Sequence, residues 1–435
     1  MTQSKEPAPR ASRRGFLAAT AGLAAGSVAG CLAPATAAEA LGSAGATRAG
    51  QHPIVPFWGK HQSGIVTPAQ PHTYFASFDL VTTQRDEVVE MLRQWTSAAA
   101  RMSTGQPADQ PRAEGAPSAS ADSGDVLDLP PSRLTLTFGF GAQLFIKDGK
   151  DRYGLAAHRP EALVDMPIFT GDQLVPTRTG GDLSVQACAD DPQVAFHAVR
   201  QLARLAGDVA QIRWVQTGFI AAAGASATPR NLMGFKDGTA NPPVADPGAM
   251  DQFVWVGSEG PDWMRGGSYL VARRSRIALE HWDRMSVAFQ EQTFGRSKLS
   301  GAPLGKKSEF GPLDLEATDH EGNPVVPENS HVRLGHHTSN EGARILRRSY
   351  SYNDGVNFTA ERWPPWRQGL EYDAGLFFVC YQRDPRSGFI RIFERMSKFD
   401  MMNQFVTNTG SGLFACPAGI DKGGFIGQRL FEAAL

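Results

Sequence analysis

The sequence predicts an α+β protein in which two ferredoxin-like units are fused in one chain. The chain has 435 residues, which is long enough for about two to three domains of ordinary size. Hydrophobic residues make up 41% and charged residues 20% of it, close to the shares of globular proteins with a buried core. The first half alternates strand and helix patterns in the order of a split βαβ unit, and the second half repeats that order more loosely.

The first half contains four strand patterns and two helix patterns. Period-two alternation and aromatic or β-branched content predict strands at 72–81, 134–138, 182–188 and 211–216. Apolar residues at helical spacing predict helices at 85–99 and 192–203, with Asp191 as the cap of the second helix. We therefore expect an N-terminal ferredoxin-like domain over residues 52–224.

The second half, residues 225–435, is expected to form the second ferredoxin-like unit. Its patterns indicate strands at 268–272 and 376–382, a helix at 277–289 and a mixed, partly helical stretch at 389–405. A separate stretch, 104–130, is rich in Pro, Ala, Ser, Gly and Asp and has no apolar periodicity. It is predicted to be a mobile surface insertion within the first unit.

The N-terminus has the pattern of an export signal. Arg13 and Arg14 precede a weakly apolar stretch of Ala and Gly, and a small-x-small cleavage pattern ends at residue 37. We interpret residues 1–37 as a twin-arginine signal peptide and 38–51 as a flexible linker, and expect a periplasmic or extracellular protein. In an alternative interpretation, the segment Val-Ala-Gly-Cys resembles a lipobox, which would make the protein a lipoprotein anchored through Cys31.

Charge and cysteine content exclude several classes of protein. Lys and Arg number 43 against 44 Asp and Glu, a net charge of -1, so the basic surface that a nucleic-acid binder needs is not indicated. The four cysteines are too few and too widely spaced for a disulfide scaffold or a zinc ribbon. Three of them, Cys188, Cys380 and Cys416, stand in apolar, strand-like contexts and are expected to be buried.

Three short segments carry the residue types of a chemical site. Asp237 stands between glycines in Gly-Phe-Lys-Asp-Gly-Thr-Ala-Asn, which presents a carboxylate on a turn. His331 stands in Ser-His-Val-Arg and Arg347 in Leu-Arg-Arg. A histidine can bind a haem iron, while an acid and an arginine can manage the proton and the charge of a departing oxygen. An Asp-Gly turn alone is common, so the prediction depends on the three segments together.

These three segments resemble the motifs of the dye-decolourising haem peroxidases, in particular the exported deferrochelatase/peroxidase branch. Other segments agree with that family in order and spacing, namely 59–65, 180–186, 294–298, 301–304 and 376–382. The resemblance covers roughly residues 52–430. It implies paired ferredoxin-like units of the dimeric α+β barrel type, with one haem b in the C-terminal unit.

The resemblance also implies roles for individual residues. Asp237 and Arg347 correspond to the catalytic distal acid and arginine, and His331 to the axial ligand of the haem iron. Where relatives commonly show Ala-Asn-Pro, this chain has Gly-His-His-Thr, whose two imidazoles could either form a hydrogen bond with a haem carboxylate or lie in solvent. The residues expected to contact the haem are Gly238, Thr239, Ala240, His331, His336, His337, Thr338 and Arg347.

The implied reaction is the reduction of hydrogen peroxide coupled to oxidation of bulky organic donors at the haem edge. Asp237 would move a proton from one peroxide oxygen to the other, and Arg347 would stabilise the negative charge that develops. The alternative is a deferrochelatase, which releases iron from haem and leaves the porphyrin intact. The expected partners are hydrogen peroxide, an organic reductant or porphyrin, components of an iron-uptake system and a second copy of the chain, with no nucleic acid.

Overall fold

The computed structural model describes residues 53–110, 122–221, 228–360 and 368–433. The chain divides into residues 1–51 and a compact unit that contains all of the described residues. The predicted signal peptide, the linker and Cys31 therefore lie outside the described part. None of the helices in that part is both long and apolar enough to cross a membrane.

The N-terminal half forms a ferredoxin-like unit, as predicted. Its elements follow in the order β1 (His72–Leu80), α1 (Arg85–Met102), β2 (Thr135–Gly141), β3 (Leu183–Ala189), α3 (Pro192–Ala206) and β4 (Ala210–Phe219). The strands pair antiparallel in the order β2-β3-β1-β4. Asp191 caps α3 by accepting from two backbone N–H groups, as expected.

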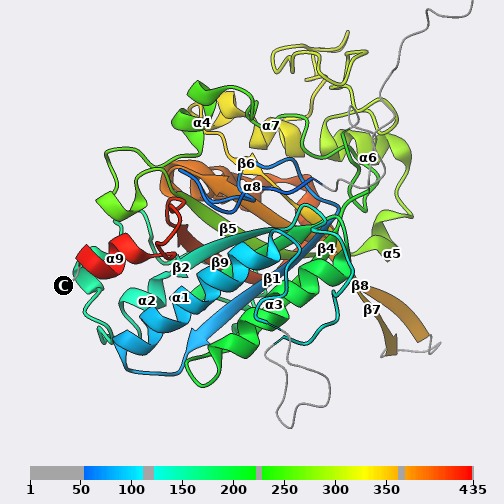
Figure 1. Ribbon diagram of the computed structural model, residues 1–435. Helices are drawn as coiled ribbons and strands as arrows, with labels where there is room; N and C mark the ends of the chain where they lie inside the picture. Colours follow the sequence, from blue (N-terminus) through cyan, green and yellow to red (C-terminus); the bar gives the residue numbers. More distant parts are fainter. Residues whose placement is uncertain (1–52, 111–121, 222–227, 361–367, 434–435) are drawn as a thin grey trace, which may run out of the picture. The chain divides into compact units, whose positions relative to one another are not determined.

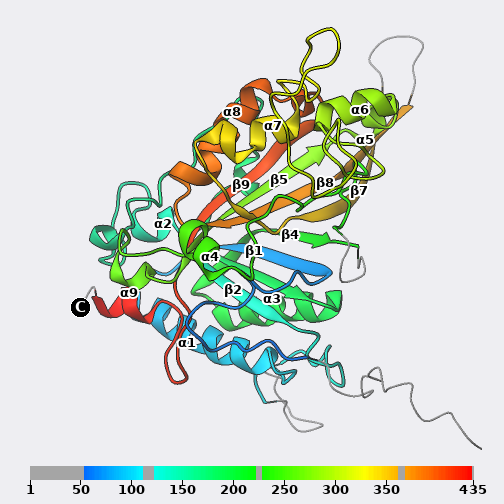
Figure 2. The ribbon, with the colours of Figure 1, turned by 90° about the horizontal axis from the view of Figure 1, so that it is seen from above.

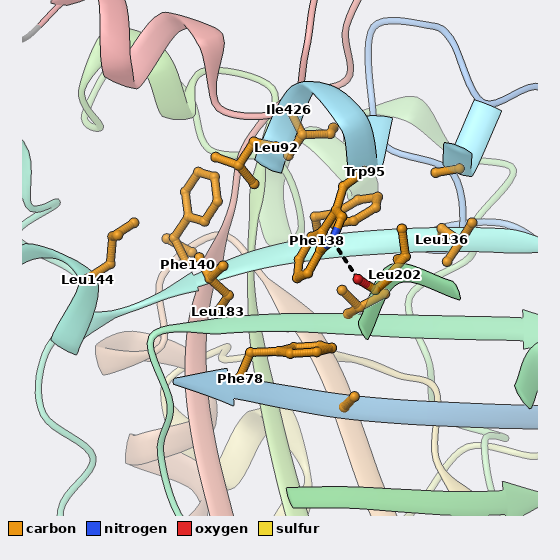
Figure 3. Close-up of a cluster of buried hydrophobic side chains, with 14 of the residues drawn as sticks. Phe78, Leu92, Trp95, Leu136, Phe138, Phe140, Leu144, Leu183, Leu202 and Ile426 are labelled. Carbon is orange, nitrogen blue, oxygen red and sulfur yellow. Dashed lines mark hydrogen bonds between the residues drawn. The ribbon is translucent and has the colours of Figure 1, made fainter. Parts of the chain in front are cut away.

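The core of this unit lies between the sheet and helices α1 and α3. Trp95 of α1 is almost fully buried and donates from its indole nitrogen to the backbone oxygen of Leu202 in α3, over 2.8 Å (Figure 3). The rings of Phe78 and Phe138 pack against Trp95 from the sheet. Burial of these large apolar side chains supplies the main driving force for docking the two helices.

The C-terminal half repeats the arrangement. Its strands are β5 (Ser268–Ile277), β7 (Tyr350–Ala360), β8 (Gln368–Gln382) and β9 (Val406–Cys416), in the order β9-β5-β8-β7. The short strand β6 (Leu346–Arg347) pairs with β8. Pairing of β2 with β9 and of β4 with β7 joins the two sheets, and because β5 also pairs with β8 the strands close into a barrel.

The remaining α-helices of the described structure are shorter than α1 and α3. They are α2 (Ala142–Phe145), α4 (Pro247–Phe253), α5 (Leu279–Trp282), α6 (Val287–Phe294), α7 (His331–Gly335), α8 (Arg391–Phe399) and α9 (Gln428–Ala433). In Figure 1 and in the view from above in Figure 2, α1 and α3 lie on one side of the strands, whereas α6, α7 and α8 lie on the other. These three helices of the C-terminal half therefore cover the side of the strands opposite to α1 and α3.

Three sequence expectations for the fold are corrected. The helix predicted at 277–289 is wrong, because Ile277 ends β5 and the following residues form the short helices α5 and α6. The prediction also missed β7 and β9 and ended β5 too early. The second half of β5 reads Arg-Arg-Ser-Arg, a pattern that hides a strand, yet Arg273 and Arg274 are buried in it.

The predicted mobile insertion at 104–130 is partly packed. Asp122 is buried and accepts from the backbone N–H of Ala108 over 2.7 Å. Asp125 lies 2.9 Å from Nδ1 of His197, a buried residue of α3. The described parts of this stretch, 104–110 and 122–130, are thus fixed against the N-terminal unit.

Candidate active site

A cavity of about 530 Å³ lies in the C-terminal half. Strands β5, β8 and β9 supply one set of lining residues, which includes Ile277, Leu376 and Val406, while α7 and α8 supply another. The lining combines apolar side chains with about as many charged and polar ones. A volume of this size and this mixture of groups are typical of cofactor and small-molecule sites.

The loop that carries Asp237 is held rigidly at one wall of this cavity. Oδ1 of Asn231 accepts from the backbone N–H groups of Met233 and Phe235, and the Phe235 ring stacks on Phe294 with centroids 3.8 Å apart. The backbone N–H of Asp237 donates to Pro229 over 2.9 Å. Gly238 has φ +112°, a left-handed conformation that favours glycine. The carboxylate is therefore presented on a turn, as the sequence predicted.

The structure brings Asp237 and Arg347 into direct contact. Arg347 lies on β6, and its Nη1 donates to Oδ1 of Asp237 over 2.8 Å. Both side chains are about three-quarters buried, with exposed fractions of 22% and 27%. Charge-assisted hydrogen bonds of this kind fix both orientation and charge.

His331 lines the same cavity from the first residue of α7. Its Nδ1 lies 2.7 Å from Oδ2 of Asp400, a buried carboxylate whose other oxygen accepts from the backbone N–H of Met402. Donation from Nδ1 to the carboxylate leaves the lone pair of Nε2 free to bind a metal. Asp400 was missed by the sequence reasoning, because nothing in its local pattern connects it with a histidine 69 residues away.

His336 and His337 also line the cavity, with ring centroids 4.1 Å apart. Burial lowers the pKa of His336 to about 4, with further lowering by the nearby charges of His337, Arg344 and Arg296. The imidazole of His336 is therefore neutral near neutral pH. Thr338 was expected to contact the haem, but it is exposed and does not line the cavity. Its Oγ1 lies 2.8 Å from Nδ1 of His336.

Gly238, Thr239 and Ala240, which are expected to contact the haem, line the cavity. A second acid, Glu309, connects this loop to another segment, since its carboxylate accepts from Thr239 over 3.0 Å and also contacts Lys236 and Thr228. Although burial acts in the opposite direction, these hydrogen bonds lower the pKa of Glu309. Glu309 was not predicted, because it lies in a loop without a recognisable pattern.

The lining residues fit a haem. Apolar side chains would cover a porphyrin ring, and the free Nε2 of His331 suits iron. Arg296 and Arg344 supply positive charge at the cavity for the haem carboxylates. Arg273 lines it too, is ion-paired with the buried Asp172, and has a buried Nε without a hydrogen-bond partner in the described structure.

A second cavity of about 520 Å³ adjoins the first. Both cavities are lined by Asp237, Asn241 and Arg347, so the acid–arginine pair lies where they meet. Residues 65–69 of the N-terminal half line the second cavity as well. The Asp237–Arg347 pair, called the distal pair below after its expected place relative to a haem, is therefore bordered by both cavities.

The cysteines behave as expected. Cys188, Cys380 and Cys416 are buried, and burial raises the pKa of Cys380 and Cys416. Within the described residues, no three His, Cys, Asp or Glu side chains are grouped so that they could hold a metal ion by themselves. Three histidines, His331, His336 and His337, line the cavity, and Nδ1 of His331 is bound to the carboxylate of Asp400.

Comparison with known proteins assigns both halves of the chain to the same protein family. Residues 62–220 match the family model described as Dyp-type peroxidase, N-terminal, and residues 228–421 match Dyp-type peroxidase, C-terminal. The chain is 40% identical over 387 residues to a dye-decolorizing peroxidase of Thermobifida fusca (strain YX), covering 85% of this chain and 84% of that protein.

Two further similarities extend over nearly the same length. A deferrochelatase of Escherichia coli (strain K12) is 34% identical over 387 residues, covering 87% of each protein. The solved oxyferrous/water mixed complex of DtpA from Streptomyces lividans is 41% identical with a TM-score of 0.77, covering 87% of this chain and 98% of that one. The chain therefore belongs to the Dyp-type peroxidase family.

Proposed function

We propose that the protein is a haem b peroxidase with one haem per chain, in which Asp237 and Arg347 activate hydrogen peroxide. One observation carries the proposal. The Asp237–Arg347 pair, with its 2.8 Å hydrogen bond, borders the same cavity as a histidine whose Nδ1 is bound to a carboxylate. Storage of haem alone requires no acid and arginine beside the metal site, whereas peroxide cleavage uses both.

Nε2 of His331 would hold the haem iron, and Asp400 would keep the imidazole in the required tautomer and orientation. The haem carboxylates would be held by the cationic groups Arg296 and Arg344 and by the neutral imidazole of His336. When bound, the haem supplies an iron centre that takes up the oxidising equivalents of peroxide.

Asp237 acts as an acid–base group for peroxide. Its carboxylate accepts the proton from one peroxide oxygen and returns it to the other as the O–O bond breaks, so that the second oxygen leaves as water. The two electrons for this cleavage would come from the haem. The Arg347 guanidinium stabilises the negative charge on the departing oxygen and holds the carboxylate in place. Peroxide would reach the pair through the second cavity, which borders both side chains.

The donor is proposed to be a bulky organic molecule oxidised at the edge of the haem. The cavity is filled by the porphyrin once it is loaded, so a large donor would stay at its rim. A relative named dye-decolorizing peroxidase, 40% identical, supports this substrate class.

The second candidate function is that of a deferrochelatase, which would release iron from haem in an iron-uptake system. Proteins named deferrochelatase are 34–35% identical over 387 residues, which supports this candidate. Incubation of haem-loaded protein with a reductant and a ferrous chelator decides between the two. A deferrochelatase yields fluorescent, iron-free porphyrin, whereas a peroxidase alone yields none.

The cellular location and the oligomeric state of the protein are inferred from the sequence. We infer export by the twin-arginine route, with cleavage after residue 37 or, alternatively, lipidation of Cys31. Mass spectrometry of the N-terminal peptide of protein recovered from cells distinguishes the two. We also infer a homodimer, which light scattering of the haem-loaded protein tests.

The proposed activity is tested by mixing haem-loaded protein with one equivalent of hydrogen peroxide in a stopped-flow instrument. The haem absorption is expected to change rapidly and to return to its initial form faster when a dye is present. An absorption spectrum that stays constant while peroxide persists in solution would contradict the proposal.

A further inference from the structure

The side chain of Asn241 connects the turn that carries Asp237 with strand β6, which carries Arg347. Its Nδ2 donates to the backbone oxygen of Arg347 over 2.8 Å, and its Oδ1 accepts from the backbone N–H of the same residue at 3.1 Å. The side-chain amide thus satisfies both backbone groups of Arg347. We call this pair of hydrogen bonds the Asn241 amide bridge.

The amide bridge supplies the two hydrogen bonds that a neighbouring strand would otherwise make with the backbone of Arg347. Strand β6 has two residues and pairs with β8 on one edge, where the backbone N–H of Arg348 donates to Val379 over 2.7 Å. The backbone groups of Arg347 point to the other edge and meet Asn241 there. A buried or half-buried backbone N–H or oxygen without a partner costs about 1–3 kcal/mol, so Asn241 stabilises the short strand at the residue that matters for the site.

Asn241 is also fixed to the turn that presents Asp237. Its backbone N–H donates to the oxygen of Gly238 over 3.0 Å, which closes the turn immediately after the acid. The amide side chain therefore sets the distance between the backbone of the Asp237 turn and that of Arg347. The 2.8 Å contact between carboxylate and guanidinium depends on that distance.

We propose that Asn241 is a positioning residue that holds Asp237 and Arg347 in the geometry needed for peroxide cleavage. It acts through these two residues and not on peroxide itself. The inference depends on the proposed function, because it assigns Asn241 a role in the same reaction.

Asn241→Asp is the sharpest variant. It is nearly isosteric and keeps an acceptor for the Arg347 N–H, but it replaces the Nδ2 donor by an oxygen that faces the oxygen of Arg347. The two oxygens repel, so β6 and the Asp237 turn must move apart. Asn241→Ala removes both hydrogen bonds without repulsion and serves as the second variant.

Gln62 offers a matched control away from the cavities. Its amide makes the same type of bridge, accepting from the backbone N–H of Phe138 over 2.8 Å and donating to the oxygen of that residue over 3.0 Å. The amide also donates to the backbone oxygen of Pro417 over 2.9 Å. It is buried and lines neither cavity. Gln62→Glu therefore tests how much a broken amide bridge matters through stability alone.

The experiment uses haem-loaded full-length protein and two readouts. The first is kcat/KM for hydrogen peroxide together with KM for the dye. The second is the affinity for fluoride, followed by the haem absorption, which reports the arrangement of the distal acid and arginine without turnover. We expect Asn241→Asp to lower kcat/KM for peroxide by about 10- to 100-fold, since a misplacement of about 1 Å can cost 10²-fold. Fluoride affinity should fall with it, while haem content and KM for the dye stay unchanged.

Two results would overturn the inference. One is wild-type kcat/KM and fluoride affinity in both Asn241 variants. The other is an equal loss in Gln62→Glu, which would reduce the effect to stability. If Asn241→Asp fails to hold haem, Asn241→Ala decides by the same criteria.

Failure of this inference is distinguishable from failure of the proposed function. If Asp237→Ala and Arg347→Leu slow peroxide cleavage but the Asn241 variants do not, only the positioning role is wrong. If none of the four variants slows it, the proposed function of the distal pair is wrong as well.

Discussion

Nη1 of Arg347 lies 2.8 Å from Oδ1 of Asp237, although 110 residues separate the two in the sequence. The acid stands on a turn closed by glycine, and the arginine stands on a two-residue strand at the edge of β8. Neither element could hold its side chain in this position alone. The contact therefore shows that the distal pair is a product of the tertiary fold, and it makes the chemistry of the cavity testable at single residues.

Removing either member of the pair should slow peroxide cleavage while the haem is retained. For Asp237→Ala the expected loss in kcat/KM for peroxide is about 10²- to 10⁴-fold, the usual contribution of an acid–base group. For Arg347→Leu a loss of about 10²- to 10³-fold is expected from lost charge stabilisation. Stopped-flow absorption with peroxide in excess measures both. Rates near that of the wild type in both variants would exclude the pair from the reaction.

Asp400 should determine how tightly the haem is held. In Asp400→Asn the carboxylate that orients His331 is lost, and metal-site partners of this kind typically contribute about 10- to 100-fold in affinity. Transfer of haem to an excess of acceptor protein measures the rate of haem loss, which should rise accordingly; His331→Ala should fail to retain the haem. Asp246→Asn is a suitable control, because Asp246 caps α4 and does not line the cavity. Equal haem loss in both Asp→Asn variants would contradict the role of Asp400.

His336 should make the haem-free protein sensitive to acid. Its pKa is lowered from 6.5 to about 4 in the folded chain, mainly by burial. The unfolded chain therefore binds this proton at higher pH than the folded chain, so the contribution to stability is present above pH 6.5 and is lost as the pH falls toward 4.

The Tm of the wild type should consequently fall more steeply between pH 6.5 and 4 than that of His336→Gln. His320→Gln, at a histidine with an 89% exposed side chain, should leave the steepness unchanged. Identical pH profiles of Tm for wild type and His336→Gln would show that burial does not suppress protonation of this imidazole.

The buried ion pair of Arg273 and Asp172 should matter strongly for stability. Both side chains are at most 1% exposed, so Asp172→Ala leaves an uncompensated buried charge, which costs about 3–5 kcal/mol. Chemical denaturation of the haem-loaded protein measures the free energy of unfolding. The exposed pair of Arg265 and Asp262 is the comparison, and Asp262→Ala should cost less than about 1 kcal/mol. Equal losses in the two variants would mean that the buried pair is compensated by other groups.

The sequence predicted the N-terminal unit better than the C-terminal unit, for a physical reason. In β1 and β3 the alternation of apolar and polar residues indicates strands, although polar members such as Ser77 and Gln186 are buried too. Asp191 followed by proline marks the start of α3. In β5 the pattern fails, because buried arginines are neutralised by carboxylates distant in sequence, such as Asp172 and Asp373. In β9 the run Thr-Asn-Thr-Gly-Ser-Gly is typical of a turn, but it pairs with β5 over its length.

In the candidate site, too, the residues that could not be predicted are those whose partners lie far away in the sequence. Asp237, His331 and Arg347 could be found because each stands in a distinctive local motif, and all three line the cavity. Asp400 and Asn241 act through single hydrogen bonds or pairs of them formed in the folded chain. Asn241 belonged to a recognised segment, yet its function depends on where β6 lies. Positioning residues of this kind become visible only when the segments that they connect are placed in space.

We propose that one haem lies between His331 on one face and the Asp237–Arg347 pair on the other. Crystals of haem-loaded protein, measured at the iron absorption edge, locate the iron directly by anomalous scattering. We expect a single iron bonded to Nε2 of His331, with the Asp237 carboxylate and the Arg347 guanidinium on the opposite face of the porphyrin. Iron bonded to a different side chain, or both groups on the face of His331, would contradict it.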